Sequence, residues 1–298
     1  MRCAHCMWTV FAFVLLNYPA TPLDATEPKM DADALVVQHL NAIGSAEARA
    51  AVKTRVVRSL ASYRVLVGGS GQVNGQMGLV TDAGKVRFML KLAERDYKGE
   101  NFAFDGDQVQ AAFSNSSHSR SAFANFMVSQ DAILREGLLG GVLSTNWALL
   151  DLAGKKAKLE YKGIKKVDGR QAHEVRYRSP KTSDLEISLY FDSETLHHVK
   201  TLYSLSIGSS MAHDSLSAVR NNSGESVSGS NAVKPDHTTL EERFSDFKTV
   251  DGLSVPTHWT LEFTLELPNG VTTVSQWDLP ELKVMNNLGI DPLNFKVQ

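Results

Sequence analysis

Two adjacent histidines, His197 and His198, are the first residues whose type suggests chemistry, because imidazole nitrogens are common metal ligands. The residues around them predict a β-strand, in which neighbouring side chains point to opposite faces, so the pair cannot chelate one ion. A structural or catalytic zinc site needs three or four convergent ligands, and the other histidines are scattered singly along the chain. The sequence therefore predicts no metal site.

Two short motifs match the residue spacing of catalytic or nucleotide-binding sites but lack the neighbouring motifs and secondary structure that such sites need. Ser245 and Lys248 have the spacing of a serine–lysine nucleophile motif, but they lie in a predicted strand-to-turn stretch without the companion motifs. Gly69, Gly71 and Gly75 resemble a dinucleotide-binding loop with one residue too many, and no helix is predicted after them. We therefore predict that the protein is not an enzyme, has no catalytic residue and needs no cofactor.

Apolar surface is the unusual feature of the chain. Three segments, 86–92, 185–192 and 258–267, alternate apolar with polar residues and predict strands with one apolar face. Residues 121–151 instead carry large apolar residues at helical spacings. Their glycines, Gly137, Gly140 and Gly141, predict two short helices, because glycine costs about 1 kcal/mol in a helix interior.

A half-closed sheet cannot collapse fully onto short, interrupted helices, so we predict an apolar cavity between them that suits acyl chains and opens at the three glycines. Burial in an ordinary core is the alternative interpretation for each residue. The predicted cavity residues are Phe88, Leu90, Phe126, Leu134, Leu138, Leu139, Ile187, Leu189, Phe191, Leu261 and Phe263.

The elements that must position this cavity follow from turns and periodicity. A helix is predicted over 31–43, with an aspartate cap at its start and a glycine at its end. Asp-Gly or Asn-Gly pairs between strand-like runs predict hairpins. These pairs are Asp105-Gly106, Asp168-Gly169, Asp251-Gly252 and Asn269-Gly270. We expect about ten antiparallel strands in a single curved meander, a mainly β half-barrel with helices across its concave face.

The N-terminus predicts export. Residues 1–25 read as a signal peptide with a ten-residue apolar run, too short to span a bilayer of about 30 Å. Cleavage is expected between Ala25 and Thr26 or between Ala20 and Thr21, and an uncleaved anchor is the alternative. The two cysteines of the chain both precede these positions, so the mature chain is predicted to lack cysteine.

Length and charge bound the remaining possibilities. The 298 residues carry 31 basic and 33 acidic side chains and a net charge of -2, which argues against nucleic acid as a partner. We expect one domain over 26–298, exported to the periplasm as a monomer. Residues 208–237 are rich in serine, asparagine and glycine and predict a long mobile loop.

Four segments together resemble the LolA/LolB-like superfamily of periplasmic lipoprotein-carrier proteins. Residues 104–113 are similar to its recurring Asp-Gly strand pair, and 189–196 to its strand that ends in Asp-x-x-Thr. Residues 244–256 are similar to its hairpin with the pattern Asp-Gly-Leu followed by proline, and 288–295 to its proline-containing closing tail. The order and spacing of these segments, rather than any one of them, carry the resemblance.

The resemblance implies a non-enzymatic exported protein that binds lipid acyl chains or lipoprotein in the concave cavity. An envelope regulatory or sensor domain that binds a protein partner on the same fold is the alternative. The cavity arginine associated with LolA has three candidate positions here, Arg64, Arg87 and Arg135.

Overall fold

The computed structural model describes residues 31–94, 97–112, 119–182, 184–207 and 236–297. The predicted signal peptide therefore lies outside the described residues, as does the predicted loop up to residue 235. The strand that follows this loop begins at Asp236. The expected loop end at residue 237 was thus two residues too late.

The described residues form one antiparallel sheet of thirteen strands, three more than expected from the sequence. The extra strands are short, and the shortest pair only three or four residues with a neighbour. The strands are β1 Thr54–Val67, β2 Gln72–Asp82, β3 Lys85–Leu92, β4 Asn101–Phe104, β5 Val109–Ala111, β6 Lys158–Val167, β7 Arg170–Arg178, β8 Leu185–Asp192, β9 His198–Ile207, β10 Asp236–Val250, β11 Leu253–Glu266, β12 Thr272–Leu279 and β13 Lys283–Asn286.

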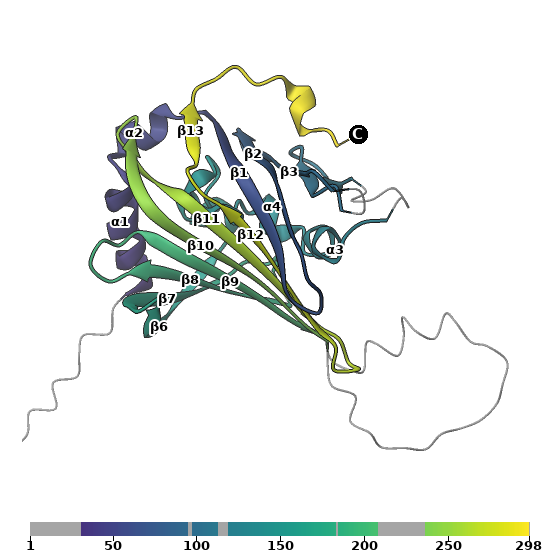
Figure 1. The fold of residues 1–298 in the computed structure, drawn as a ribbon. Helices are drawn as coiled ribbons and strands as arrows, with labels where there is room; N and C mark the ends of the chain where they lie inside the picture. The colour runs from purple at the N-terminus through teal and green to yellow at the C-terminus, as the bar shows by residue number, and fades with distance from the viewer. Residues whose placement is uncertain (1–30, 95–96, 113–118, 183, 208–235, 298) are drawn as a thin grey trace, which may run out of the picture.

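The strand order shows two meanders rather than one. Strands run β5-β4-β3-β2-β1-β12-β11-β10-β9-β8-β7-β6 across the sheet, and β13 continues beside β1 (Figure 1). Strands β5 and β6 follow each other in sequence but lie at opposite edges. The chain between them must therefore cross one face of the sheet.

That crossing is made by residues 121–155, here called the cover segment. It contains α3 Ala122–Ser129, α4 Ala132–Arg135, the 3₁₀ turns η1 Gly141–Leu143 and η2 Ala148–Leu150, and α5 Leu152–Lys155. The prediction of two helices divided by glycines was too simple, because only α3 and α4 precede the glycines and short turns follow them. Ser121 caps α3 by accepting a hydrogen bond from the amide of Ala124 at 2.9 Å.

Two further helices lie near the N-terminus of the described chain. The predicted first helix is confirmed as α1 Ala32–Ile43, with Asp31 as its N-cap and Gly44 as its C-cap. The short helix α2 Ala46–Ala51 follows and was not predicted. No helix in the described ranges is both long and apolar enough to cross a bilayer.

Two of the predicted hairpin turns have positive φ at two consecutive residues, as predicted from their Asp-Gly pairs. Asp168 and Gly169 both have positive φ, 48° and 88°, as do Asp251 and Gly252 at 50° and 76°. Two-residue turns of this kind match the right-handed twist of the strands they join. They set the register of β6 with β7 and of β10 with β11.

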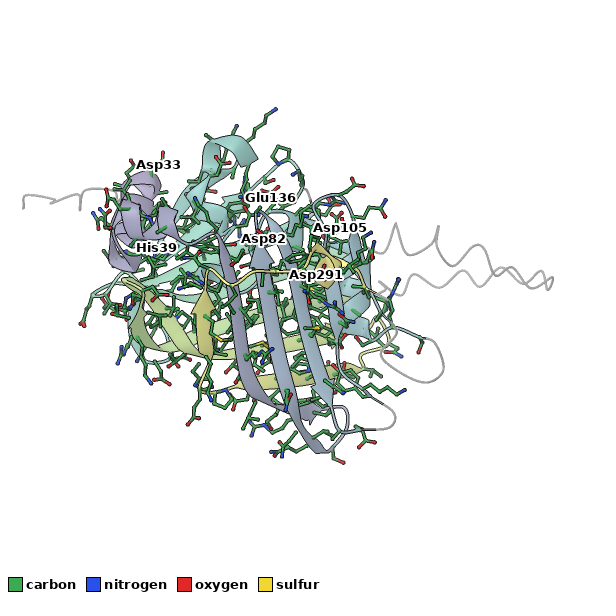
Figure 2. All side chains as sticks on the ribbon, turned by 90° about the horizontal axis from the view of Figure 1, so that it is seen from above. Asp33, His39, Asp82, Asp105, Glu136 and Asp291 are labelled. Atoms are coloured by element: carbon green, nitrogen blue, oxygen red, sulfur yellow. The ribbon has the colours of Figure 1, made fainter. Side chains whose placement is uncertain are left out.

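Strand alternation gives the curved sheet an inner face, which the cover segment and α1 cover, and an outer face. On β3, Phe88 and Leu90 point inward and are buried, whereas Met89 and Lys91 point outward. The inner-face side chains join those of the helices in one large apolar core. The outer face carries the C-terminal tail (residues 287–297), which includes the 3₁₀ turn η3 Pro292–Phe295 and crosses β1–β3 (Figure 2, yellow segment at Asp291).

Candidate functional site

All eleven predicted cavity residues lie in the apolar core between the inner face and the cover segment. The sheet contributes seven of them from β3, β8 and β11, and the cover segment contributes four. Every one of these side chains is at most 5% exposed. The structure thus brings the predicted residues together, in a closed and filled arrangement. That they bind lipid stays a prediction.

Aromatic rings fill the part of this core beneath α3. Phe123 lies 4.8 Å from the Trp277 ring and 5.6 Å from the Phe102 ring, and Phe126 lies 5.6 Å from Phe263. Phe102 stacks on Phe88 at 4.9 Å. Offset and edge-to-face arrangements at these distances are favourable for aromatic pairs. A ligand entering here has to displace rings of α3 from rings of the sheet.

The three glycines expected to form a hinge permit close approach of the chain, Gly137 within the cover segment and Gly140 and Gly141 between it and the sheet. Gly137, Gly140 and Gly141 have φ of 70°, 77° and 51°, in the left-handed region that favours glycine. A Cβ at Gly137 would lie 1.8 Å from the backbone oxygen of Asn146, and one at Gly141 would lie 2.5 Å from the His198 ring. These glycines therefore fix a tight turn against the sheet, and a role in opening stays a prediction.

A buried carboxylate holds this turn from the sheet. Glu242 on β10 is fully buried, and its Oε2 accepts a hydrogen bond from the Gly140 amide at 2.8 Å. Its Oε1 accepts one from the Tyr203 hydroxyl at 2.7 Å. Burial raises the pKa of Glu242 to about 7, although both hydrogen bonds favour the charged form. A carboxyl with such a pKa changes charge near neutral pH.

A second buried carboxylate belongs to the cover segment itself. Glu136, labelled in Figure 2, is fully buried and accepts a hydrogen bond from the Tyr177 hydroxyl of β7 at 2.9 Å. The Lys181 ammonium lies 3.2 Å from its other oxygen. Burial raises the pKa of the Tyr177 hydroxyl, and the nearby Glu136 adds to that shift. Tyr177 therefore remains a hydrogen-bond donor at neutral pH.

A buried arginine on the sheet also contacts the cover segment. Arg55 on β1 is 4% exposed, and its Nη1 donates to the backbone oxygen of Val142 at 2.5 Å. Its Nε donates to the Asn286 side chain at 2.8 Å. Burial lowers the pKa of Arg55 to about 10, which still leaves the guanidinium charged at neutral pH. Arg55 was not predicted from the sequence, although it lies two residues before the inward-facing Val57 and therefore points to the same face of the sheet.

Of the three arginines proposed for the cavity, Arg64 and Arg87 lie on the outer face of the sheet. Arg64 is exposed and donates to the side chain of Gln276, and Arg87 lies on the outer face and donates to the backbone oxygen of Asn294. Arg135 pairs with Asp131 along the cover segment. Arg64 and Arg87 point away from the apolar core, because they alternate with inward-facing neighbours on their strands. The Arg135 guanidinium lies 5.1 Å from the ring centre of Phe104, which belongs to that core.

Histidines lie where α1 meets the sheet. His39 Nδ1 donates to the backbone oxygen of Leu196 at 2.8 Å, and its Nε2 accepts from the Trp147 indole at 3.2 Å. Burial lowers the pKa of His39 to about 4, so it is neutral at neutral pH. His198 is also fully buried and stacks on Trp147, whereas His197 stacks on Phe247 and is half-buried. Within the described ranges, no three histidine, cysteine, aspartate or glutamate residues cluster to hold a metal.

Comparison with known proteins gives similarity of structure only. No family model and no curated protein matches the sequence. A LolA superfamily protein from Nitrosomonas europaea is similar over 90% of this chain and 98% of its own, at 11% identity and a TM-score of 0.42. A DUF1329 family protein from Desulfovibrio piger is similar over 88% and 96%, at 13% identity and a TM-score of 0.39.

A third solved structure is described as a domain of an outer membrane lipoprotein-sorting protein from Vibrio parahaemolyticus. It is similar over 86% of this chain and 93% of its own, at 8% identity and a TM-score of 0.38. Two of these structures are described as LolA-like or lipoprotein-sorting proteins, the group that the sequence motifs resemble. At these identities and scores the likeness says nothing about ligand or partner.

Proposed function

We propose that the protein binds acyl chains, of lipid or of lipoprotein, between the inner face of the sheet and the cover segment. The observation that carries this proposal is the construction of the cover segment. It presents apolar side chains to an apolar sheet, and its polar contacts are scattered, among them those of Glu242, Glu136 and Arg55, the Trp147–His39 hydrogen bond and the Thr145–Thr81 hydrogen bond. An apolar interface with scattered polar contacts can separate and accept an apolar ligand in place of one partner.

The energetics of this exchange suit reversible binding. Burying one acyl methylene contributes about 0.8 kcal/mol, so a sixteen-carbon chain contributes on the order of 12 kcal/mol. The same chain has to replace contacts that the cover segment already makes, including the aromatic pairs beneath α3. The net affinity is the difference between these two terms, and a carrier needs that difference to be small enough for release.

We further propose that the protein acts without catalysis, as an exported periplasmic monomer whose single domain spans residues 26–298. The ten-residue apolar run near the N-terminus supports export. The alternative of an envelope regulatory domain that binds a protein partner stays a prediction.

A reversible cross-link between the cover segment and the sheet tests the proposal. The hydroxyl oxygens of Thr145 and Thr81 lie 3.1 Å apart, one on the cover segment and one on the inner face of β2. Residues 26–298 contain no cysteine, so in that chain Thr81→Cys with Thr145→Cys introduces one isolated pair. The binding of a fluorescent sixteen-carbon fatty acid is measured in the oxidised and the reduced protein.

The oxidised double variant is expected to lose binding by at least about tenfold, and reduction should restore it, because only the reduced cover segment can move. Each single cysteine variant serves as the matched control and should bind equally in both redox states. Equal binding by the oxidised and reduced double variant would show that the ligand does not enter beneath the cover segment.

A further inference from the structure

The outer face of β1–β3 carries a groove beside the C-terminal tail. Two hollows, of about 670 and 390 Å³, share Arg58, Gly78 and Met89 and so form one depression. Strand pairing aligns these three residues in one row across β1, β2 and β3. The next row, further from the tail, is Leu60, Gln76 and Lys91. We call the surface over these two rows the outer groove.

A glycine keeps the floor of the outer groove open. Gly78 lies in the middle of β2, where glycine weakens a strand. A Cβ at this position would meet only the Met89 methyl group, at an ordinary contact distance of 3.4 Å, and its φ lies outside the left-handed region. The fold therefore does not require glycine here. What the missing side chain provides is space over the sheet, where another chain can approach.

The rim of the outer groove has an excess of positive charge. Arg58 pairs directly with Lys283 across β1 and β13, and like charges placed opposite each other destabilise a sheet. Lys91 lies at the other end, and the one carboxylate that lines the same hollow is Glu281. All four residues are exposed, and Leu60 beside them is 69% exposed. An apolar floor between three cations favours an occupant that is both apolar and anionic.

The C-terminal tail shows how this face binds a peptide. Phe295 is 1% exposed and packs on Val56 and Val80, the row next to Arg58 and Gly78. The Arg87 guanidinium donates to the backbone oxygen of Asn294 at 3.0 Å, and the Lys85 ammonium lies 5.9 Å from the Phe295 ring centre. The tail thus inserts one apolar side chain between cations that bind its backbone and ring.

We propose that the outer groove binds an extended, acidic peptide segment of a partner protein, which inserts one large apolar side chain over Gly78. Arg58, Lys91 and Lys283 bind the carboxylates of this segment, and Leu60 and Met89 pack against its apolar side chain. The segment lies beside the tail and repeats its mode of binding one row further along the strands. This site is independent of the acyl-chain site, because its side chains point to the opposite face of the sheet.

Selection from a display library of random ten-residue peptides, with the full chain as bait, tests this proposal. The expected result is enrichment of peptides with net negative charge and at least one phenylalanine, tryptophan, leucine or methionine. The enriched peptide is then labelled, and its dissociation constant is measured by fluorescence anisotropy at low and high salt. Screening of the exposed charges should weaken the binding at high salt.

Three variants locate the binding. Gly78→Leu fills the floor and Arg58→Glu reverses a rim charge, and each should raise the dissociation constant at least about tenfold. Arg64→Glu is the matched control, because Arg64 lies on the same outer face but does not line the groove. It should change the dissociation constant less than about twofold. Urea unfolding of each variant confirms that the sheet is intact.

Three results would overturn the proposal. One is a selection that enriches no acidic, apolar peptide. Another is an enriched peptide whose affinity is the same for the wild type and for folded Gly78→Leu. The third is binding to phosphatidylglycerol vesicles, lost in Arg58→Glu, without any peptide enrichment, which would identify the groove as a membrane contact instead.

Discussion

The two faces of β3 both carry apolar side chains, but one face is buried in the core and the other lines an open groove. Phe88 points inward and is fully buried beneath the cover segment, whereas its neighbour Met89 points outward and lines the open outer groove. The difference comes from topology, since the connection from edge strand β5 to edge strand β6 crosses only the inner face. The comparison shows that apolar residues on a strand form a core or a docking surface according to which segment covers them.

The largest expected effect tests whether the inner face is a packed core. Phe88→Ala should lower the free energy of unfolding by about 3–5 kcal/mol, because the lost ring leaves a cavity between Phe102 and Trp259. Met89→Ala, one residue away on the outer face, should cost less than about 1 kcal/mol. Urea unfolding measures both. A cost for Phe88→Ala as small as that for Met89→Ala would mean that the inner face is not packed and the comparison fails.

The second prediction concerns pH and the tie between sheet and cover segment. The pKa of Glu242 is raised by burial to about 7 in the folded chain, against about 4.5 when the side chain is in water. Below pH 4.5 the carboxyl is protonated in both states, so its contribution to stability is fully present. As the pH rises through 7 the folded state has to ionise a buried group, and on the order of 3 kcal/mol is lost.

Glu242→Gln removes this titration. Between pH 4.5 and 8 the wild type should lose stability relative to Glu242→Gln, as measured by urea unfolding at both pH values. Taking the difference between two proteins cancels the opposing contribution of His39, whose lowered pKa reduces stability as the pH falls. Glu262→Gln on the outer face serves as the control. An unchanged difference across this range would show that Glu242 is not a buried acid in solution.

Much of the fold could be predicted because periodicity and turn chemistry act locally. The alternation of β3, β8 and β11 and the Asp-Gly turns predicted an antiparallel sheet with one apolar face, and the structure confirms it. The pairing of β1 with β12 could not be predicted, since it joins residues more than 200 positions apart. The short strands β4, β5 and β13 carry too few residues for alternation to identify them.

The candidate site likewise contains residues that the sequence predicts and residues that it does not. Its apolar residues were predicted, because burial follows from residue type and strand parity. The polar contacts that hold the cover segment were missed, because Arg55 and Glu242 occupy inward positions where the alternating pattern predicts apolar residues. Hydrogen bonds to partners distant in sequence offset the cost of burying these two side chains: Val142 and Asn286 for Arg55, and Gly140 and Tyr203 for Glu242. No local pattern reveals those partners.

A third, smaller effect concerns how firmly the tail covers its part of the outer face. Phe295→Ala should free the tail at a cost of about 1–2 kcal/mol, less than for Phe88, because only the tail has to detach. Hydrogen exchange at the Lys296 amide, which donates to the backbone oxygen of Leu293, should accelerate while exchange in β1 stays unchanged. Leu293→Ala, at a side chain that is 64% exposed, is the control. Faster exchange throughout β1 would show that the tail belongs to the core.

The smallest expected effect compares two glycines of the same strand. Gly78→Ala should raise the free energy of unfolding by about 0.5 kcal/mol, because alanine favours the strand and its Cβ meets no atom closer than 3.4 Å. Gly75→Ala should instead destabilise the protein, because its Cβ would lie 2.0 Å from the backbone oxygen of Lys91. Thermal unfolding of both variants measures this contrast. Replacing a glycine that the fold needs lowers the free energy of unfolding, whereas replacing one that only leaves room for an approaching chain raises it. If Gly78→Ala instead destabilises the protein, Gly78, like Gly75, is required by the fold, and the main argument for the outer groove as a binding site is lost.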